Sequence, residues 1–439
     1  MTKFRRDCNV YIERPGYLEK LKRRMGNGQI KVITGMRRCG KSFLLFRIFC
    51  DFLREQGVDD AHLVSVALDD VRNAPLRDPE ALYDYVTSRI ADDGLTTYVL
   101  LDEIQYAISR EEIRDRQRDV RLYGVLNGLM HMRNVDVYVT GGNSKLLSKD
   151  VMTEFRGRGD VVEVRPLSFR EYYGYVGGDR TQAYEDYALW GGLPLVLDKQ
   201  EEEEKLSYLS SLFDEVYFRD VVERYGIERP DVLGEIVDSL CSSVGSLTNA
   251  NKITKTLNSV RGVKASCETV GAYLEFLTES FLFEQAKRYD VKGKRYFEYP
   301  SKYYCADVGL RNVRLGLRQQ EETHIMENVI YNDLVARGLS VDVGVIELSE
   351  KDDDGARRQK SCEIDFVVNR GSARYYIQSA LSMVDERKVQ QELRPLLSVD
   401  DSFRKIVVSK TSARPWNDEK GVLHLGLYDF LLDENSLGA

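Results

Sequence analysis

An apolar run leads directly into a glycine-rich turn at residues 30–42, which read Ile30-Lys31-Val32-Ile33-Thr34-Gly35-Met36-Arg37-Arg38-Cys39-Gly40-Lys41-Ser42. Residues 35–42 match the pattern G-x-x-x-x-G-K-S, in which the glycines let several backbone N–H groups point at one anion. In this pattern Lys41 reaches the β- and γ-phosphates of a nucleotide, and the hydroxyl of Ser42 binds Mg²⁺. The apolar stretch Phe43–Phe49 then continues as a helix. A strand, a turn and a helix in this order predict that residues 35–42 bind ATP within an α/β fold.

A second apolar run, Tyr98–Leu101, ends in the two acids Asp102 and Glu103. Alone, such a run would more often be a strand end with a polar cap. After a phosphate-binding turn, the pair has a chemical role available in ATP hydrolysis. We therefore expect Asp102 to hold the magnesium ion and Glu103 to be the base that polarises the attacking water.

Two further candidates follow the next apolar run, Val135–Thr140. Asn143 is placed to orient the water or to sense the γ-phosphate, although it serves equally well as the cap of a following helix. Arg158 is a candidate for stabilising charge in the transition state, within one subunit or across a subunit boundary. Arg156 has the same chemistry, and for both the alternative is an arginine in a surface loop.

Short apolar runs alternate with helical stretches over residues 28–170, which is typical of a parallel sheet with helices between its strands. Helical spacing dominates residues 180–320, and strand patterning returns over residues 321–439, with runs at 341–347, 362–368, 374–378 and 405–408. We predict three domains: a P-loop NTPase core over residues 1–175, a helical domain over residues 176–320, and a small α/β domain over residues 321–439.

Composition excludes several classes of protein. Hydrophobic residues make up 43% of the 439 residues, with 26 tyrosines and 16 phenylalanines, so a long disordered chain is excluded. No apolar stretch approaches the ~18 residues that a membrane-spanning helix needs. The net charge of −8 argues against a general polyanion-coating protein. Seven scattered cysteines without a C-x-x-C pair indicate neither a zinc ribbon nor a disulfide framework. The start of the chain leads into no apolar segment, so we expect no secretory signal and a cytoplasmic protein.

Several motifs together resemble a group of prokaryotic AAA+ ATPases. The shared motifs are the phosphate loop, Leu101–Gln105, Thr140–Ser148, Gly157-Arg158 before Pro166–Tyr172, Trp190–Pro194, and Lys302–Tyr304 with Asp307 and Gly309. The resemblance covers nearly the whole chain. It implies an ATP-binding core, a winged-helix-like middle and a C-terminal part similar to restriction-endonuclease folds.

The middle region predicts a winged helix over Ser246–Tyr304 from its own residues. Two short helices, 249–257 and 266–277, flank a turn at Gly262, and a hairpin follows around Lys292-Gly293-Lys294. This span holds ten Lys or Arg against six Asp or Glu, a local charge of +4. Lys292, Lys294 and Arg295 would lie on the hairpin and contact DNA. Winged helices also dock proteins, so both kinds of partner stay open.

The C-terminal region carries the elements of a metal-dependent nuclease except one. Glu327 lies on a predicted helix, Asp365 on a strand and Gln378 on the next strand. Carboxylates in such folds hold Mg²⁺, and a lysine stabilises the charge on the phosphorus. That lysine is replaced by Ala380, so we expect a nuclease-like fold that does not cut efficiently; the alternative is a set of ordinary surface carboxylates.

Three functions remain open from the sequence. The first is an ATP-hydrolysing switch or motor that uses Mg²⁺ and acts on DNA or a protein partner. The second is an ATP-regulated nuclease, and the third is a non-catalytic, nucleotide-gated binding protein. The pair Asp102–Glu103 favours hydrolysis over binding alone, whereas Ala380 argues against the nuclease. Whether the protein is a monomer or a homo-oligomer stays open.

Overall fold

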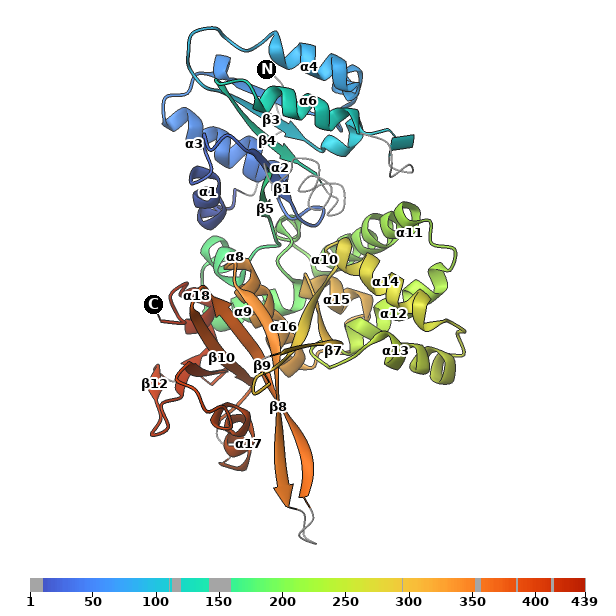
Figure 1. Ribbon diagram of the computed structural model, residues 1–439, viewed down its shortest axis with the longest axis vertical. Coiled ribbons are helices and arrows are strands. Elements are labelled where there is room, and N and C mark those ends of the chain that lie inside the picture. The colour runs from blue at the N-terminus through green and yellow to red at the C-terminus, as the bar shows by residue number, and fades with distance from the viewer. Residues whose placement is uncertain are drawn as a thin grey trace. The chain divides into compact units, whose positions relative to one another are not determined.

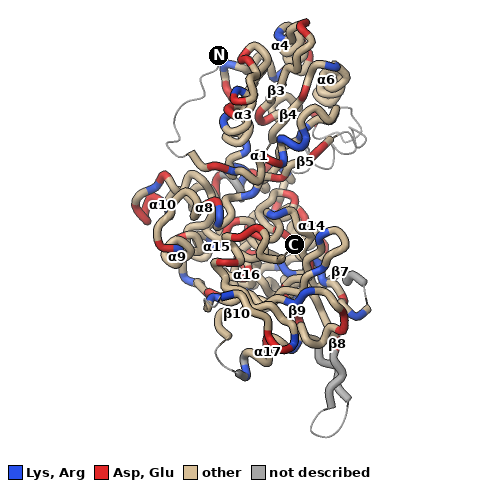
Figure 2. The backbone as a smooth tube through the Cα atoms, turned by 90° about the vertical axis from the view of Figure 1, so that its left-hand side faces the viewer, with Lys and Arg blue, Asp and Glu red and all other residues tan. Residues whose placement is uncertain are grey.

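A computed structural model describes residues 11–109, 111–112, 120–141, 159–293, 295–351, 357–383, 386–411 and 414–438. The chain forms two units, which we describe separately. Unit 1 holds residues 1–166 with residues 279–281, and unit 2 holds residues 167–278 and 282–439. Charged residues of both signs are interspersed along each unit (Figure 2).

Unit 1 is built on a five-stranded parallel sheet (Figure 1). Its strand order is β2-β3-β4-β1-β5, so β4 lies between β1 and β3. The strands are β1 (Ile30–Thr34), β2 (Leu63–Ala67), β3 (Thr97–Asp102), β4 (Val135–Thr140) and β5 (Gly159–Glu163). Parallel strands must be joined by crossover segments, which explains why helices separate the apolar runs in the sequence. The predicted P-loop core with a parallel sheet is confirmed.

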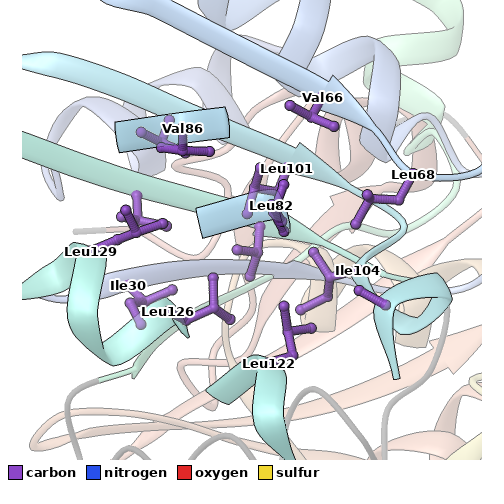
Figure 3. Packing of buried hydrophobic residues seen from close by; sticks show 14 of the residues in the cluster. Ile30, Val66, Leu68, Leu82, Val86, Leu101, Ile104, Leu122, Leu126 and Leu129 are labelled. Atoms are coloured by element: carbon purple, nitrogen blue, oxygen red, sulfur yellow. The ribbon is translucent and has the colours of Figure 1, made fainter. Parts of the chain in front are cut away.

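The helices of unit 1 bury apolar side chains at helical spacing. Leu122, Leu126 and Leu129 of α6 and Leu82 and Val86 of α4 pack in one cluster with the strands (Figure 3). Burying each such side chain contributes about 1.5–3 kcal/mol, which fixes the sheet on which the site is built. The helical segments are α1 (Pro15–Lys22), α2 (Lys41–Phe43), the π-helix η1 (Leu44–Phe49), α3 (Cys50–Glu55), α4 (Pro79–Thr87) and α6 (Arg121–Met130), with the 3₁₀ turns η2 (Asp60–His62), η3 (Val71–Arg77) and η4 (Ile104–Ala107).

A buried ion pair joins β1 to β4. The ammonium of Lys31 pairs with the carboxylate of Asp136, and both side chains are almost completely buried. Asp136 also accepts hydrogen bonds from the Tyr138 hydroxyl at 2.9 Å and from the Gly26 backbone N–H at 3.0 Å. This explains how a lysine fits in a strand that is buried on both faces.

Unit 2 contains an eight-stranded mixed sheet in the order β12-β13-β11-β10-β9-β8-β6-β7. Its strands are β6 (Phe283–Asp290), β7 (Arg295–Cys305), β8 (Ser340–Lys351), β9 (Arg357–Arg370), β10 (Ala373–Ala380), β11 (Arg404–Ser409), β12 (Trp416–Asn417) and β13 (Leu423–Gly426). The four runs predicted in the C-terminal region all form strands of this sheet. The antiparallel pair β8 and β9 forms the long hairpin of Figure 1.

The helices of unit 2 include the two short helices predicted around Gly262. They are α8 (Phe169–Val176), α9 (Arg180–Trp190), η6 (Pro194–Val196), α10 (Glu202–Ser211), η7 (Leu212–Phe218), α11 (Arg219–Tyr225), α12 (Pro230–Ser242), α13 (Ala250–Thr256), η8 (Leu257–Arg261), α14 (Cys267–Glu279), α15 (Val308–Arg314), α16 (Glu322–Ala336), α17 (Glu386–Leu397) and α18 (Leu427–Leu432). Gly262 takes the positive φ of +68° that a turn between two helices requires.

The hairpin of β6 and β7 belongs to the large sheet and not to the middle region alone. β6 pairs with β7 in antiparallel fashion and with β8 in parallel, through Arg288–Val343 and Tyr289–Gly344. The sheet therefore continues across residue 320, where the sequence suggested a domain boundary. The pairing of β6 with β8 joins segments about fifty residues apart, and no local pattern marks it.

Candidate active site

The phosphate loop follows β1 and has a backbone that only particular residues adopt. Gly35 has a φ of +134°, and a Cβ atom there would lie 2.0 Å from the carbonyl oxygen of Val164. Gly40 has a φ of +97° and Arg38 a φ of +63°. Both glycines of the motif are thus required by conformation, and Gly35 is also required by its contact with the backbone after β5.

Hydrogen bonds from outside and inside the motif hold the loop in place. The Arg14 guanidinium donates to the Cys39 carbonyl oxygen at 3.0 Å, and the Cys39 thiol donates to the Val164 carbonyl oxygen at 3.2 Å. The Lys41 ammonium donates to the carbonyl oxygens of Met36 at 2.9 Å and Gly35 at 3.1 Å. Lys41 therefore lies folded back against its own loop. Sequence reasoning missed Arg14, which no motif marks.

Asp102 is the last residue of β3 and is almost completely buried. Burial raises the pKa of Asp102 to about 6, while hydrogen bonds from the side chains of Thr140 and Ser42 act in the opposite direction. The nearby Glu103 carboxylate raises the pKa further. The structure thus brings together the end of β3, the end of β4 and the start of the helix after the phosphate loop.

Glu103 follows directly in a left-handed conformation, with a φ of +52°. Its backbone N–H donates to the Thr140 hydroxyl oxygen at 3.1 Å, and its carboxylate accepts a hydrogen bond from the Gln105 side-chain amide. A positive φ in a residue that is not glycine is uncommon and is often found at functional sites. The Thr140 hydroxyl thus contacts the backbone of Glu103, and the Gln105 amide contacts its carboxylate.

Thr140 is a second residue of this site that sequence reasoning missed. Its hydroxyl donates to Asp102 and accepts from the backbone of Glu103, so one side chain contacts both acids. The signal was present, because Thr140 is the last residue of β4 and the carboxyl ends of parallel strands meet at one edge. Its importance depends on β4 lying beside β3, which the strand order decides.

The donor set fits a magnesium ion together with a nucleotide. Mg²⁺ prefers oxygen ligands and is usually bound by one or two carboxylates plus substrate phosphates. The Asp102 carboxylate and the Ser42 hydroxyl, which are hydrogen-bonded to each other, supply two such oxygens. Within the part of the chain that the structure describes, no group of three or more His, Cys, Asp or Glu side chains is arranged to hold a metal ion.

Two predicted site residues, Asn143 and Arg158, lie outside the described residues, as does Arg156. Their roles stay predictions. The structure does bring together the phosphate loop with Asp102, and it places Glu103 next to them through Thr140.

The predicted residues of the C-terminal site also lie near one another. Glu327 is on α16, Asp365 on β9 and Gln378 on β10. The Gln378 amide oxygen accepts from the Asp365 backbone N–H at 3.4 Å. Lys302 of β7 contacts both Glu327 and Asp365, and sequence reasoning did not connect it with them. Ala380 is buried in an apolar cluster with residues of α17, such as Leu396, so its small side chain is part of a core.

Comparisons with known proteins show which proteins and families this chain is similar to. A family model described as an AAA domain matches residues 27–173, and a second, described as a domain of unknown function (DUF8612), matches residues 181–321. An uncharacterized protein of Haemophilus influenzae is 30% identical over 403 residues, which are 91% of this chain and 93% of the relative. An uncharacterized protein of Methanocaldococcus jannaschii is 26% identical over 359 residues, 77% of this chain and 72% of that one. Among solved structures, a Walker-type ATPase of Pyrococcus abyssi has a TM-score of 0.49 at 16% identity and covers 70% of this chain and 96% of that chain. No helix in the described residues is long and apolar enough to cross a membrane.

Proposed function

This chain belongs to a family of prokaryotic AAA+ ATPases, and from that premise we propose that it hydrolyses ATP as a switch or motor. In this proposal residues 35–42 bind the triphosphate, and the Ser42 hydroxyl and the Asp102 carboxylate hold Mg²⁺. Glu103 is the general base. Hydrolysis changes the state of a DNA or protein partner.

The observation that carries the proposal is the hydrogen-bonded set of Ser42, Asp102, Thr140 and Glu103. It supports hydrolysis over binding alone, because a binding site needs the phosphate loop but not a second acid held beside the magnesium acid. Magnesium supplies charge neutralisation of the phosphate oxygens when it is bound. The chain contributes the anion-binding N–H groups, the ammonium of Lys41 and a carboxylate that takes a proton from water.

Two further roles in the proposal belong to residues outside the described part of the chain. Asn143 would orient the attacking water or sense the γ-phosphate, and Arg158 would stabilise the transition-state charge. Removing an interaction of this type typically costs about 10²–10³ in rate. Each role is therefore open to measurement by single substitution.

Three variants test the hydrolytic function. We expect Lys41→Ala to lose ATP binding, because the charge of the β- and γ-phosphates is then unpaired in a low-dielectric site. Glu103→Gln keeps ATP binding and loses turnover, because an amide does not accept the proton of water. Glu55→Gln removes an exposed carboxylate of α3 and serves as the matched control. Hydrolysis by Glu103→Gln at the parent rate would contradict the assignment of the base.

A second part of the proposal concerns which surface meets DNA, if DNA is the partner. Four cations on α13, η8 and the following loop are exposed: Lys252, Lys255, Arg261 and Lys264. By contrast α14, which follows them, carries three glutamates and no lysine or arginine. Phosphate contacts require cations, so this surface favours α13 and its loop over α14 as the backbone-binding element. Lys292 on the hairpin is also exposed, whereas Lys294 lies outside the described residues.

A salt titration with a labelled DNA duplex tests whether DNA binds at α13 or at the hairpin of β6 and β7. Each lost phosphate contact reduces the slope of log K against log salt by about 0.9. The double variant Lys252→Ala with Lys255→Ala should lose two phosphate contacts. We therefore expect its slope to be smaller than that of the parent by about 1.8. The triple variant of Lys292, Lys294 and Arg295 reports on the hairpin, and Lys420→Ala, an exposed lysine elsewhere in unit 2, is the control. Unchanged affinity in both test variants would favour a protein partner.

A further inference from the structure

A single ammonium group lies among three carboxylates within the large sheet of unit 2. The Lys302 Nζ atom is 2.7 Å from Oε1 of Glu327, 2.6 Å from Oε1 of Glu363 and 3.6 Å from Oδ1 of Asp365. The Lys302 side chain is 2% exposed. We call Glu327, Glu363 and Asp365 the carboxylate cluster. Its members come from α16 and β9, and the lysine comes from β7.

Neighbouring groups hold the carboxylate cluster in place. The Tyr304 hydroxyl, two residues after Lys302 on β7, donates to Oε1 of Glu327 at 2.7 Å. The Ser379 backbone N–H and hydroxyl donate to Oδ2 of Asp365 at 2.8 and 3.1 Å. These bonds leave Oδ1 of Asp365 facing Lys302. Glu327 and Asp365 are therefore held in place by the protein beside the Lys302 ammonium.

The charges of this group favour a cation at its centre. Three carboxylates surround one ammonium, and Arg288 acts on Glu363 as a second positive charge, so the carboxylates outnumber the cations near them. Burial raises the pKa of Glu327 to about 7, although Lys302 lowers it. Burial alone would lower the pKa of Lys302, but the three carboxylates outweigh burial and raise it. The ion pairs at 2.7 Å with Glu327 and 2.6 Å with Glu363 thus hold the Lys302 ammonium within the carboxylate cluster.

Oxygen ligands of this kind are also those that a divalent metal ion prefers, but the ammonium excludes one. Mg²⁺ requires carboxylate oxygens at about 2.0–2.1 Å. An ion bound to the same oxygens of Glu327 and Glu363 would lie in contact with the Lys302 ammonium. The two charges of the ion and the one charge of the ammonium would then be held by the same two oxygens. Electrostatic repulsion at such a separation is strong in a buried site. The lysine and a metal ion therefore compete for the same oxygens of this cluster.

We propose that Lys302 is a resident cation of the C-terminal region, whose ammonium takes the place of a divalent metal ion among Glu327, Glu363 and Asp365. The region consequently binds no metal ion at this cluster and lacks metal-dependent cleavage of phosphodiesters. Lys302 does not replace the lysine missing at Ala380. Its hydrogen atoms point at carboxylates and its side chain is buried, so it has no access to a phosphate.

The test measures Mn²⁺ binding to the full chain without nucleotide, by electron paramagnetic resonance of the free ion. We expect Lys302→Met, which keeps the length of the side chain and removes its charge, to gain one Mn²⁺ site. The Lys302→Met variant should bind Mn²⁺ at this cluster at least tenfold more tightly than the unmodified protein does, a difference of about 1.4 kcal/mol. The double variant Lys302→Met with Asp365→Asn should lose the gained site. Lys302→Arg keeps the cation and gains no site.

A matched control removes a different lysine of the same sheet. The Lys405 ammonium on β11 donates to the Val399 carbonyl oxygen and not to a carboxylate, so Lys405→Met should gain no Mn²⁺ site. Because comparison is made between variants that share the nucleotide site of unit 1, Mn²⁺ bound there cancels. The result is independent of ATP hydrolysis, so failure of one proposal leaves the other standing.

Two results would overturn the proposal. One is a Mn²⁺ site in the parent that Asp365→Asn abolishes, since the ammonium would then not exclude the metal. The other is a Lys302→Met variant that gains neither a Mn²⁺ site nor any Mn²⁺-dependent rise in melting temperature. The melting measurement covers the case in which unpaired carboxylates weaken the fold, because a bound metal ion then restores stability by mass action.

Discussion

Replacing Thr140 by valine tests whether the hydroxyl that contacts both acids controls the charge of Asp102. Thr140→Val keeps the shape of the side chain and removes a hydrogen bond to the Asp102 carboxylate. That bond favours the ionised form of Asp102, which burial already disfavours. Asp102 must be ionised to hold Mg²⁺. Loss of the hydrogen bond from Thr140 should therefore shift the pH dependence of ATP hydrolysis.

The size of the shift follows from the hydrogen bond. Hydrogen bonds to charged groups contribute about 1.5–3 kcal/mol, and one pKa unit corresponds to about 1.4 kcal/mol. Starting from a pKa of about 6, the variant should have an Asp102 pKa of roughly 7–8. The ionised fraction at neutral pH then falls from about nine-tenths to between roughly one-half and one-tenth. In both proteins activity falls as pH falls through this pKa.

The assay is the pH dependence of kcat/KM for Mg-ATP, which reports the pKa values of the free enzyme. We expect the acid limb of Thr140→Val to lie roughly one to two pH units above that of the parent, with activity recovering at high pH. Thr97→Val is the control, because Thr97 is a buried threonine on the same strand as Asp102 whose hydroxyl has no hydrogen-bond partner among the described residues. Superimposable acid limbs for Thr140→Val and the parent would refute this account of the site.

Three other outcomes are expected. Lys31→Met should destabilise unit 1 by about 3–5 kcal/mol in urea unfolding, because it leaves the Asp136 carboxylate buried without its ion pair; a change below about 1 kcal/mol would contradict the importance of that pair. Gly35→Ala should abolish nucleotide binding measured by calorimetry, because its Cβ would meet the Val164 carbonyl oxygen; retained binding would show that the loop relaxes freely. The parent should not nick supercoiled plasmid with Mg²⁺ or Mn²⁺ and ATP, and metal-dependent nicking that Asp365→Ala abolishes would count against the resident cation.

The sequence was informative wherever the chemistry is local. The phosphate loop is contiguous, so its glycines and Lys41 could be located from spacing, and the positive φ values of Gly35 and Gly40 agree with that placement. The strands were predictable for the same reason, because β-branched runs bounded by turns or helices identify buried strands one at a time. Asp102 could be placed at the end of a strand, with Glu103 directly after it, because the two acids follow such a run. These predictions needed no knowledge of which strand pairs with which.

Tertiary structure decided the contacts between segments that are distant in the chain. Thr140 matters because β4 lies between β1 and β3, and Arg14 because it reaches the carbonyl of Cys39, twenty-five residues away. Lys302 and Asp365 are sixty-three residues apart in the chain, and no local pattern relates them. They meet because β6 and β7 belong to the same sheet as β8 and β9. Strand pairing and burial depend on the free energy of the whole packed unit. A residue whose role is to pair a charge across a sheet therefore carries no local signal, whereas a loop that must wrap one anion does.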